Sequence, residues 1–170
     1  MYLIIEGVYM IVFIEIIIFC LLFTMMVYLM SKNPIATLYN YPPKIQKKVK
    51  SLPEYKDKIP TNKNKIITKL IVTVFIIIIV SLVLRYVNGY ETFKETFLNS
   101  LLIWTSINIY DVIVLDLLWF CQSEKFIFKG TEDIKDEYHN YWFHIKEGLI
   151  GELIGTLVCI IIGLVVGFIL

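Results

Sequence analysis

Charged residues are scarce in this 170-residue sequence, and the motifs of several common enzyme classes are missing from it. Charged side chains make up 18% of the chain, against about 25% in soluble domains. The sequence contains no H-E-x-x-H, no G-x-S-x-G and no G-x-x-x-x-G-K pattern. These absences exclude a zinc protease of the H-E-x-x-H type, an α/β-hydrolase and a P-loop nucleotide hydrolase.

Cysteine is also rare, and its spacing is not that of a zinc site or a redox pair. The three cysteines, Cys20, Cys121 and Cys159, each lie in or beside an apolar run, and none belongs to a C-x-x-C pair. Such residues usually behave as small buried hydrophobic side chains. We therefore expect free thiols, and the sequence predicts no cofactor.

Long apolar runs dominate what the sequence does contain. Hydrophobic residues make up 58% of it and are gathered into four blocks. A helix of about 20 residues crosses the ~30 Å hydrocarbon core of a bilayer. The blocks predict spans at about 7–30, 66–87, 96–121 and 148–170. We expect an all-α integral membrane protein in which residues 1–170 form one transmembrane domain, an antiparallel four-helix bundle.

The lysines are distributed unevenly, and this predicts the topology. Ten of the fifteen lysines fall between Lys32 and Lys69, where only Glu54 and Asp57 oppose them. Lysine-rich short loops remain in the cytoplasm. We expect the loops 31–65 and 122–147 to be cytoplasmic, the first of them basic, and both termini to be extracytoplasmic.

Within the first loop, Pro42 and Pro43 favour the start of a short amphipathic helix. Ile45, Val49 and Leu52 recur there at helical spacing. The favoured interpretation is a solvated loop whose lysines set the topology, and the alternative is a helix that lies on the membrane surface. Membrane lipids, and no nucleic acid, are the predicted partners, with anionic lipid at Lys44, Lys47, Lys48 and Lys50.

Carboxylates interrupt three of the four apolar runs. A charge at bilayer depth costs at least ~2.5 kcal/mol, so such residues usually face a bundle interior and mark a path for ions or protons. In the alternative, Glu15 pairs with Arg85, Asp111 is neutral and bonded to Asn108, and the other acids are interfacial. Asp111 and Asp116 are five residues apart and would point in different directions on an α-helix. The predicted path contains Glu15, Asn108, Asp111, Asp116 and Glu152.

Two acid–histidine pairs precede or overlap the start of the fourth run. Asp136 and His139 are three residues apart, as are His144 and Glu147. On a helix this spacing places both side chains on one face, as in di-metal carboxylate sites. A metal site at the cytoplasmic face is therefore one hypothesis, and ordinary interfacial histidines beside tyrosines are the alternative.

Glycine recurs at close-packing intervals in the fourth run. Gly151 with Gly155 and Gly163 with Gly167 each match the small-x-x-x-small pattern. We expect this face to pack on another helix, either within the chain or across a homodimer.

Four stretches of the sequence together carry a resemblance: Tyr41–Gln46, Trp104–Cys121, Lys129–Asp133 and Tyr141–His144. They resemble a family of uncharacterised four-span membrane proteins from low-GC Gram-positive bacteria. The resemblance covers most of the chain and implies a multi-pass protein of the bacterial plasma membrane, but no activity.

Three classes of function remain open from the sequence. The favoured hypothesis is transport or conduction of a proton, a cation or a small amphiphile along the carboxylates. The second is a membrane-embedded enzyme acting on lipid, with Asp111, Asp116, His144 and Glu152 converging at the cytoplasmic face. The third is an accessory or immunity-type subunit that works through its glycine face.

Overall fold

The computed structural model describes residues 2–59 and 62–170, with side chains for 10–59, 67 and 69–170. The described part is 83% helix and contains no strand. Four helices are long and apolar enough to cross a membrane. This confirms the predicted all-α fold class and the membrane character of the chain. The four are α1 (Tyr2–Ser31), α3 (Asn62–Tyr86), α4 (Phe93–Tyr110) with its continuation η3 (Asp111–Phe120), and α5 (Tyr141–Phe168).

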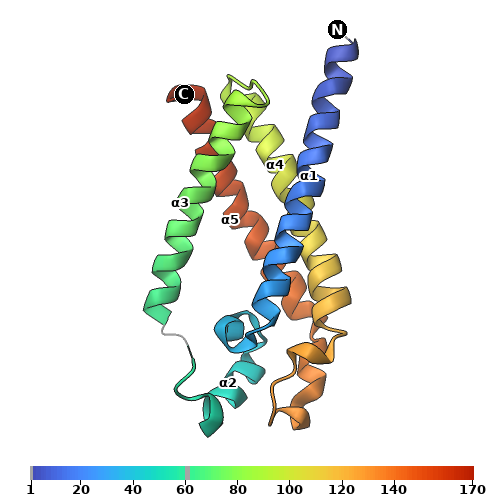
Figure 1. Cartoon of the computed structure of the whole chain (residues 1–170), viewed down its shortest axis with the longest axis vertical. Coiled ribbons are helices and arrows are strands. Elements are labelled where there is room, and N and C mark those ends of the chain that lie inside the picture. The colour runs from blue at the N-terminus through green and yellow to red at the C-terminus, as the bar shows by residue number, and fades with distance from the viewer. Residues whose placement is uncertain (1, 60–61) are drawn as a thin grey trace.

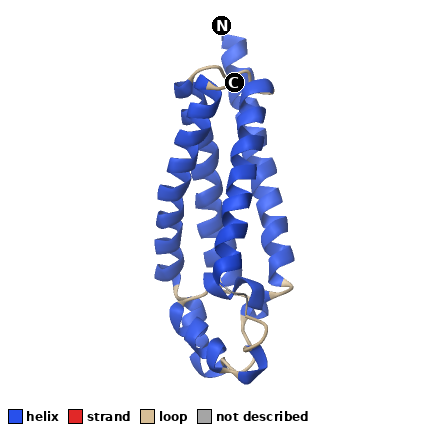
Figure 2. Cartoon of the chain, turned by 90° about the vertical axis from the view of Figure 1, so that its left-hand side faces the viewer, coloured by secondary structure: helices blue, strands red, loops and turns tan. Residues whose placement is uncertain are grey.

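The four long helices form two crossing layers. In Figure 1, α1 and α3 slant in one direction, whereas α4 and α5 slant in the other. Both termini lie at one end of the bundle, and the short helices of the two longer connections gather at the opposite end, as Figure 2 also shows. Successive long helices therefore run antiparallel.

All four long helices pack together in the half of the bundle that carries the termini. A buried apolar cluster there draws on every long helix, with Val12, Leu84, Ile103 and Ile162 at its centre and Tyr90 from the connection between α3 and α4. Of the four spans, α1 is the most exposed. Only 6% of its most apolar stretch is buried inside the protein. Its remaining apolar surface is suited to lipid contact.

The start of α5 differs from the prediction, with consequences for depth. The helix begins at Tyr141 instead of near residue 148, because the Asn140 side chain accepts a hydrogen bond from the Phe143 amide (3.1 Å) and caps it. Glu152 therefore lies about 16 Å along the helix from its first residue. The sequence interpretation placed Glu152 near the cytoplasmic boundary, and the longer helix moves it toward the middle of the span.

The last ten residues of the third span form a π-helix, η3, where an α-helix was expected. The amide of Cys121, for example, donates to the Asp116 carbonyl five residues back (2.9 Å). This wider turn brings residues five apart closer to a common face than an α-helix does. The expectation that Asp111 and Asp116 diverge assumed α-helical geometry and does not apply to this segment.

The two inner connections fold together into what we call the loop cap, residues 34–59 and 124–139. Its short helices are η1 (Pro34–Asn40), α2 (Pro43–Ser51), η2 (Pro53–Tyr55), η4 (Glu124–Phe126) and η5 (Glu132–His139). Ile45 and Val49 of α2 are fully buried. They contact a core of the cap itself, which also contains Leu38, Tyr41, Phe126, Phe128 and Tyr138.

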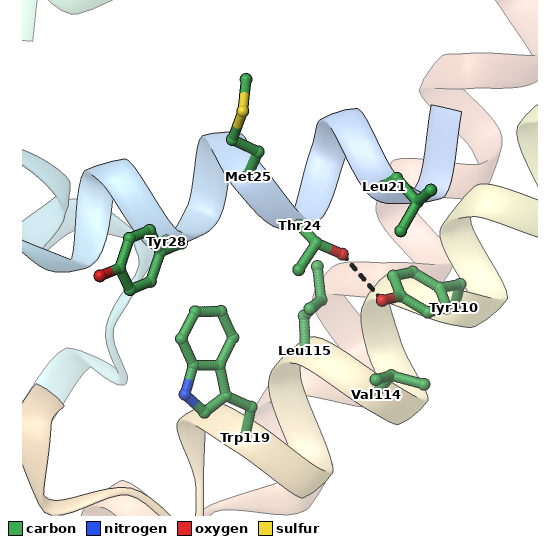
Figure 3. Close-up of a pocket in the computed structure, with 8 residues that line it drawn as sticks. All are labelled: Leu21, Thr24, Met25, Tyr28, Tyr110, Val114, Leu115 and Trp119. Atoms are coloured by element: carbon green, nitrogen blue, oxygen red, sulfur yellow. Dashed lines mark hydrogen bonds between the residues drawn. The ribbon is translucent and has the colours of Figure 1, made fainter. Parts of the chain in front are cut away.

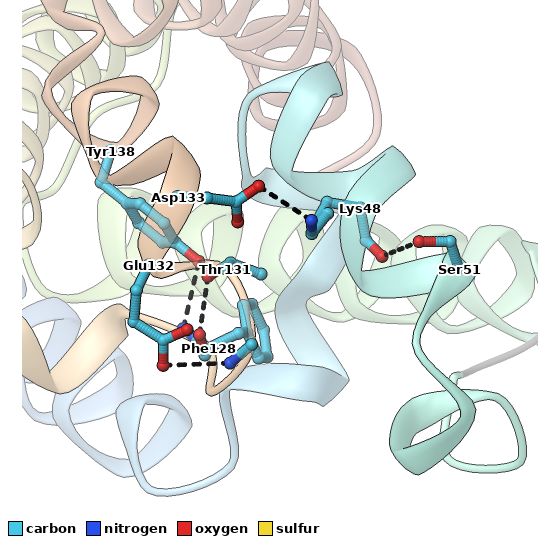
Figure 4. A network of polar contacts seen from close by, with 8 residues as sticks. Lys48, Ser51, Phe128, Thr131, Glu132, Asp133 and Tyr138 are labelled. Atoms are coloured by element: carbon cyan, nitrogen blue, oxygen red, sulfur yellow. Dashed lines mark hydrogen bonds and ion pairs between the residues drawn. The ribbon is translucent and has the colours of Figure 1, made fainter.

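The apolar face of α2 is thus directed into the cap, and two of the four lysines beside it pair with acidic residues. Lys44 pairs with Glu137, and Lys48 Nζ lies 2.9 Å from Asp133 Oδ2 (Figure 4). The alternative interpretation placed Ile45 and Val49 on a membrane surface, whereas in the structure both side chains are buried in the core of the loop cap. Binding of anionic lipid at Lys44, Lys47, Lys48 and Lys50 stays a prediction.

Candidate functional site: a polar seam between α4 and α5

At the end nearest the loop cap, a histidine of α5 contacts a carboxylate of η3. His144 Nδ1 lies 3.2 Å from Asp116 Oδ2. The His144 residue is only 3% exposed, and its Nε2 atom has no hydrogen-bond partner among the described residues. The ring lies against Phe120 and Phe143, at centroid distances of 4.9 and 5.2 Å. The Asp116 carboxylate thus contacts the imidazole at Nδ1, and the other ring nitrogen, Nε2, is left without a partner beside two phenylalanine rings.

Asp111 lies at the junction between α4 and η3, above this pair. Its side chain is partly buried and makes no hydrogen bond to a described residue, but it interacts electrostatically with Asp116 and His144. The π-helical turn helps to explain how two acids five residues apart both lie near His144. Three titratable side chains therefore share one small region between η3 and α5.

Glu152 lies further along α5 and is held by two donors from α4. Thr105 Oγ1 donates to Glu152 Oε1 (2.5 Å), and Asn108 Nδ2 donates to Glu152 Oε2 (3.0 Å). Asn108 Nδ2 also lies 3.1 Å from the carbonyl of Gly148. Both oxygens of a carboxylate near the middle of the span are thus satisfied across the helix interface. We name the set Thr105, Asn108, Asp111, Asp116, His144 and Glu152 the polar seam.

Glycines of α5 allow the two helices to approach this closely. A Cβ atom at Gly155 would overlap the indole of Trp104, and one at Gly148 would overlap the side chain of Val112. At Gly151 a Cβ would only touch Asn108 Oδ1, at 3.4 Å. The predicted glycine face therefore packs on α4 and η3, and it brings the polar groups within hydrogen-bonding distance.

The outer pair of glycines makes the same interface at the other end of α5. A Cβ at Gly163 would lie 3.0 Å from Phe93 Cδ2, and one at Gly167 would lie 2.7 Å from the Phe93 backbone nitrogen. Of the two arrangements expected for this face, the structure shows packing within the chain. A homodimer through the same face stays a prediction.

Glu15 does not belong to the seam. Its Oε2 atom accepts a hydrogen bond from Asn88 Nδ2 (3.1 Å), in the connection between α3 and α4. Arg85, the partner considered for Glu15, instead lies 3.1 Å from Glu91 Oε1 and donates to the Tyr90 carbonyl. Asn108 likewise bonds to Glu152 and not to Asp111. Both pairings of the alternative interpretation are thus replaced by others.

The residues considered for a metal site are not gathered into one. His144 is buried against Asp116, whereas Asp136, His139 and Glu147 are exposed. Within the described part of the chain, no group of three or more His, Cys, Asp or Glu side chains is arranged to hold a metal ion. The His144–Asp116 contact crosses from one span to the next, so the i, i+3 spacing gave no signal of it.

Fold and seam together define a multi-pass membrane protein with four spans and a polar interface between the last two. Comparison of the chain with protein families, with curated proteins and with solved structures found no match. The resemblance to uncharacterised Gram-positive membrane proteins therefore stays a prediction.

Proposed function

We propose that this protein conducts protons across its membrane along the polar seam. The observation that carries the proposal is the succession of titratable side chains along one helix interface, from Glu152 through Asp111 to the Asp116–His144 pair. Ionisable groups inside a membrane are costly and typically mark proton or ion pathways. Carboxyl and imidazole groups can both accept and release a proton, so each can act as one station of a relay.

Polar side chains continue beyond Glu152 toward the end with the termini. Thr96, Ser100, Trp104 and Asn108 recur every four residues and therefore share one side of α4. Thr96 Oγ1 and Trp104 Nε1 are buried without a hydrogen-bond partner among the described residues. Buried polar atoms in proteins are normally satisfied, by protein or by ordered water. Water at these atoms would extend the relay through the other half of the span.

The tightness of the interface favours a proton over a larger solute. Gly148 and Gly155 have no room for even one more carbon atom against α4 and η3. A proton can hop between side chains and single waters, whereas an amphiphile would need the two helices to separate. The bacterial plasma membrane, with both termini outside, remains the proposed location.

The enzyme hypothesis requires its four residues to converge, and they form two groups instead. Asp116 contacts His144, whereas Glu152 is bonded to Thr105 and Asn108. His144 and Glu152 are about 12 Å apart along α5. This distance is too long for joint acid–base chemistry on one bond. A proton that passes between the two groups would need Asp111 and bridging water as intermediate stations.

Proton flux into vesicles tests the proposal. The purified protein is reconstituted into vesicles that contain a pH-sensitive dye, and a potassium gradient with valinomycin sets the membrane potential. We expect the internal pH to change faster than in protein-free vesicles. Asp111→Asn and Glu152→Gln should each bring the rate down to that of protein-free vesicles, because neither amide can exchange a carboxyl proton.

Glu15→Gln is the matched control, since it removes a membrane carboxylate that lies outside the seam. It should conduct like the parent. The proposal is wrong if the parent does not exceed protein-free vesicles, or if Asp111→Asn and Glu152→Gln insert normally and conduct like the parent. A loss in Glu15→Gln as large as in Asp111→Asn would contradict the assignment of the pathway to the seam.

A further inference from the structure

A groove runs between α1 and η3. It is formed by the side of η3 that faces α1, whereas Asp116 of η3 contacts His144 of α5. It has a volume of about 510 Å³ and is lined mainly by apolar side chains (Figure 3). From α1 come Leu21, Thr24, Met25 and Tyr28, whose spacing places them on one helix face. Val114 and Leu115 of η3 form the opposite wall.

Two contacts bridge the groove. Thr24 Oγ1 and Tyr110 Oη share a hydrogen bond of 2.7 Å. Nearer the loop cap, the rings of Tyr28 and Trp119 stack with their centroids 6.5 Å apart and an interplanar angle of 17°. Figure 3 shows the two bridges at opposite ends, with Leu115 pointing into the space between α1 and η3. These two contacts thus fix the distance between α1 and η3.

The groove lies at the depth of the lipid chains next to the headgroups. Helix α1 ends at Ser31, so Thr24 lies about 10 Å inside that end of the span. Tyr28 and Trp119 are at the level where aromatic side chains usually mark the membrane interface. Leu21 and Met25 are more than half exposed, so the groove opens toward the surrounding bilayer.

A lysine stands at the end of the groove nearest the cap. Lys32 Nζ lies 5.1 Å from the centroid of the Tyr28 ring. Lys32 forms no ion pair with a described residue, whereas Lys44 and Lys48 are neutralised by Glu137 and Asp133. Its positive charge is therefore available to a ligand whose apolar part lies in the groove.

We propose that the groove binds an anionic phospholipid of the leaflet on the loop-cap side. One acyl chain lies between α1 and η3 against Val114 and Leu115, and the phosphate is held by Lys32. The occupant follows from the chemistry of the site: an apolar channel open to the bilayer accepts an acyl chain, and one unpaired cation at its interfacial end selects a negative headgroup. This site is separate from the lysines of α2.

Quenching of Trp119 fluorescence by brominated lipids tests the site. The protein is reconstituted into phosphatidylcholine vesicles with a minor fraction of chain-brominated phosphatidylglycerol or, separately, chain-brominated phosphatidylcholine. Subtracting the signal of Trp119→Phe isolates the contribution of Trp119. We expect the anionic lipid to quench Trp119 about fivefold more effectively, the preference that one lysine near the surface provides.

Three variants separate the headgroup from the chain. Lys32→Gln should make the two brominated lipids equally effective, whereas Lys47→Gln, which removes an exposed lysine of α2, should keep the preference. Val114→Phe fills the groove and should lower quenching by both lipids. Equal quenching in the parent, an equal loss of preference in Lys47→Gln, or unchanged quenching in Val114→Phe would each overturn the proposal.

Discussion

His144 Nδ1 lies 3.2 Å from Asp116 Oδ2, and this contact joins the start of α5 to the π-helical end of α4. The imidazole is almost completely buried, whereas the Asp116 side chain keeps 28% of its surface exposed. Removing only one partner leaves the other polar group without this contact, and a polar group left unsatisfied in the interior typically costs about 1–3 kcal/mol. The pair therefore links the stability of the bundle to its polar seam.

Replacing His144 by Phe should lower the stability of the bundle by about 1–2 kcal/mol. The phenyl ring preserves the packing against Phe120 and Phe143 but leaves Asp116 without a partner. The double variant His144→Phe with Asp116→Leu should recover much of the loss, because both polar groups are then gone. Unfolding in mixed micelles by increasing denaturing detergent measures all four proteins, and the coupling free energy follows from the cycle. Strictly additive losses would show that the contact does not contribute.

Gly155 should be the least replaceable glycine of α5. A Cβ there overlaps the Trp104 indole, so Gly155→Val must displace α4 or the ring, at a cost of about 1–3 kcal/mol or more. Gly151→Ala is the control, since its Cβ would make only an ordinary contact with Asn108. We expect the first variant to unfold at lower detergent and the second to match the parent. Equal behaviour of the two would contradict the close α4–α5 packing.

The long helices and their closest interface could be predicted from sequence. Apolar blocks of more than 20 residues have few alternatives to membrane spans. Gly151, Gly155, Gly163 and Gly167 indicated close packing of α5, and the structure supplies the partner, α4 with η3. Asn108 and Glu152 were also predicted as site residues, because a polar side chain in an apolar run stands out whatever it contacts.

Other features depended on geometry that periodicity does not reveal. The π-helix changes the direction of Asp116 relative to Asp111. Sequence reasoning that uses the α-helical repeat cannot detect this change. Thr105 was not predicted, because a threonine in a membrane helix usually bonds to its own backbone. Glu15 was assigned to the seam by its depth alone, whereas its partner Asn88 lies in a connection between helices.

The fold of the loop cap depends on contacts between distant segments, and α2 shows why it was not predicted. Ile45 and Val49 have the spacing of a helix that needs an apolar surface, but the spacing does not say whether that surface is lipid or protein. The partner residues, such as Phe128 and Tyr138, lie in the other connection. A basic amphipathic segment next to a membrane span is compatible with both.

Ile45→Ala should therefore loosen the loop cap. The side chain is fully buried, and truncating a buried isoleucine costs about 2–5 kcal/mol. We expect faster cleavage of the cap by a protease added to the solubilised protein, with the four spans left intact. Lys47→Ala, at an exposed position of the same helix, should be cleaved like the parent. Unchanged protease resistance of Ile45→Ala would mean that α2 is not docked in the cap.

The ion pair between the two connections predicts a dependence of cap stability on pH. Lys48 donates a hydrogen bond to Asp133 and thereby lowers the pKa of this carboxyl below its usual value of 3.8. Because the folded pKa is below the unfolded one, the stabilisation is complete above about pH 4 and is lost as the pH falls through the folded pKa. Both side chains are partly exposed, so salt should weaken the effect.

Hydrogen exchange of the cap amides, measured from pH 6 down to pH 2.5 and corrected for the intrinsic pH dependence of exchange, checks this sign. Protection should decline at the acid end in the parent, and Lys48→Gln should remove part of that decline. Lys47→Gln preserves the pair while making the same change of charge, so its profile should follow that of the parent. If Lys48→Gln and the parent lose protection in parallel, the pair does not hold α2 against η5, and the buried core of the cap accounts for the docking without it.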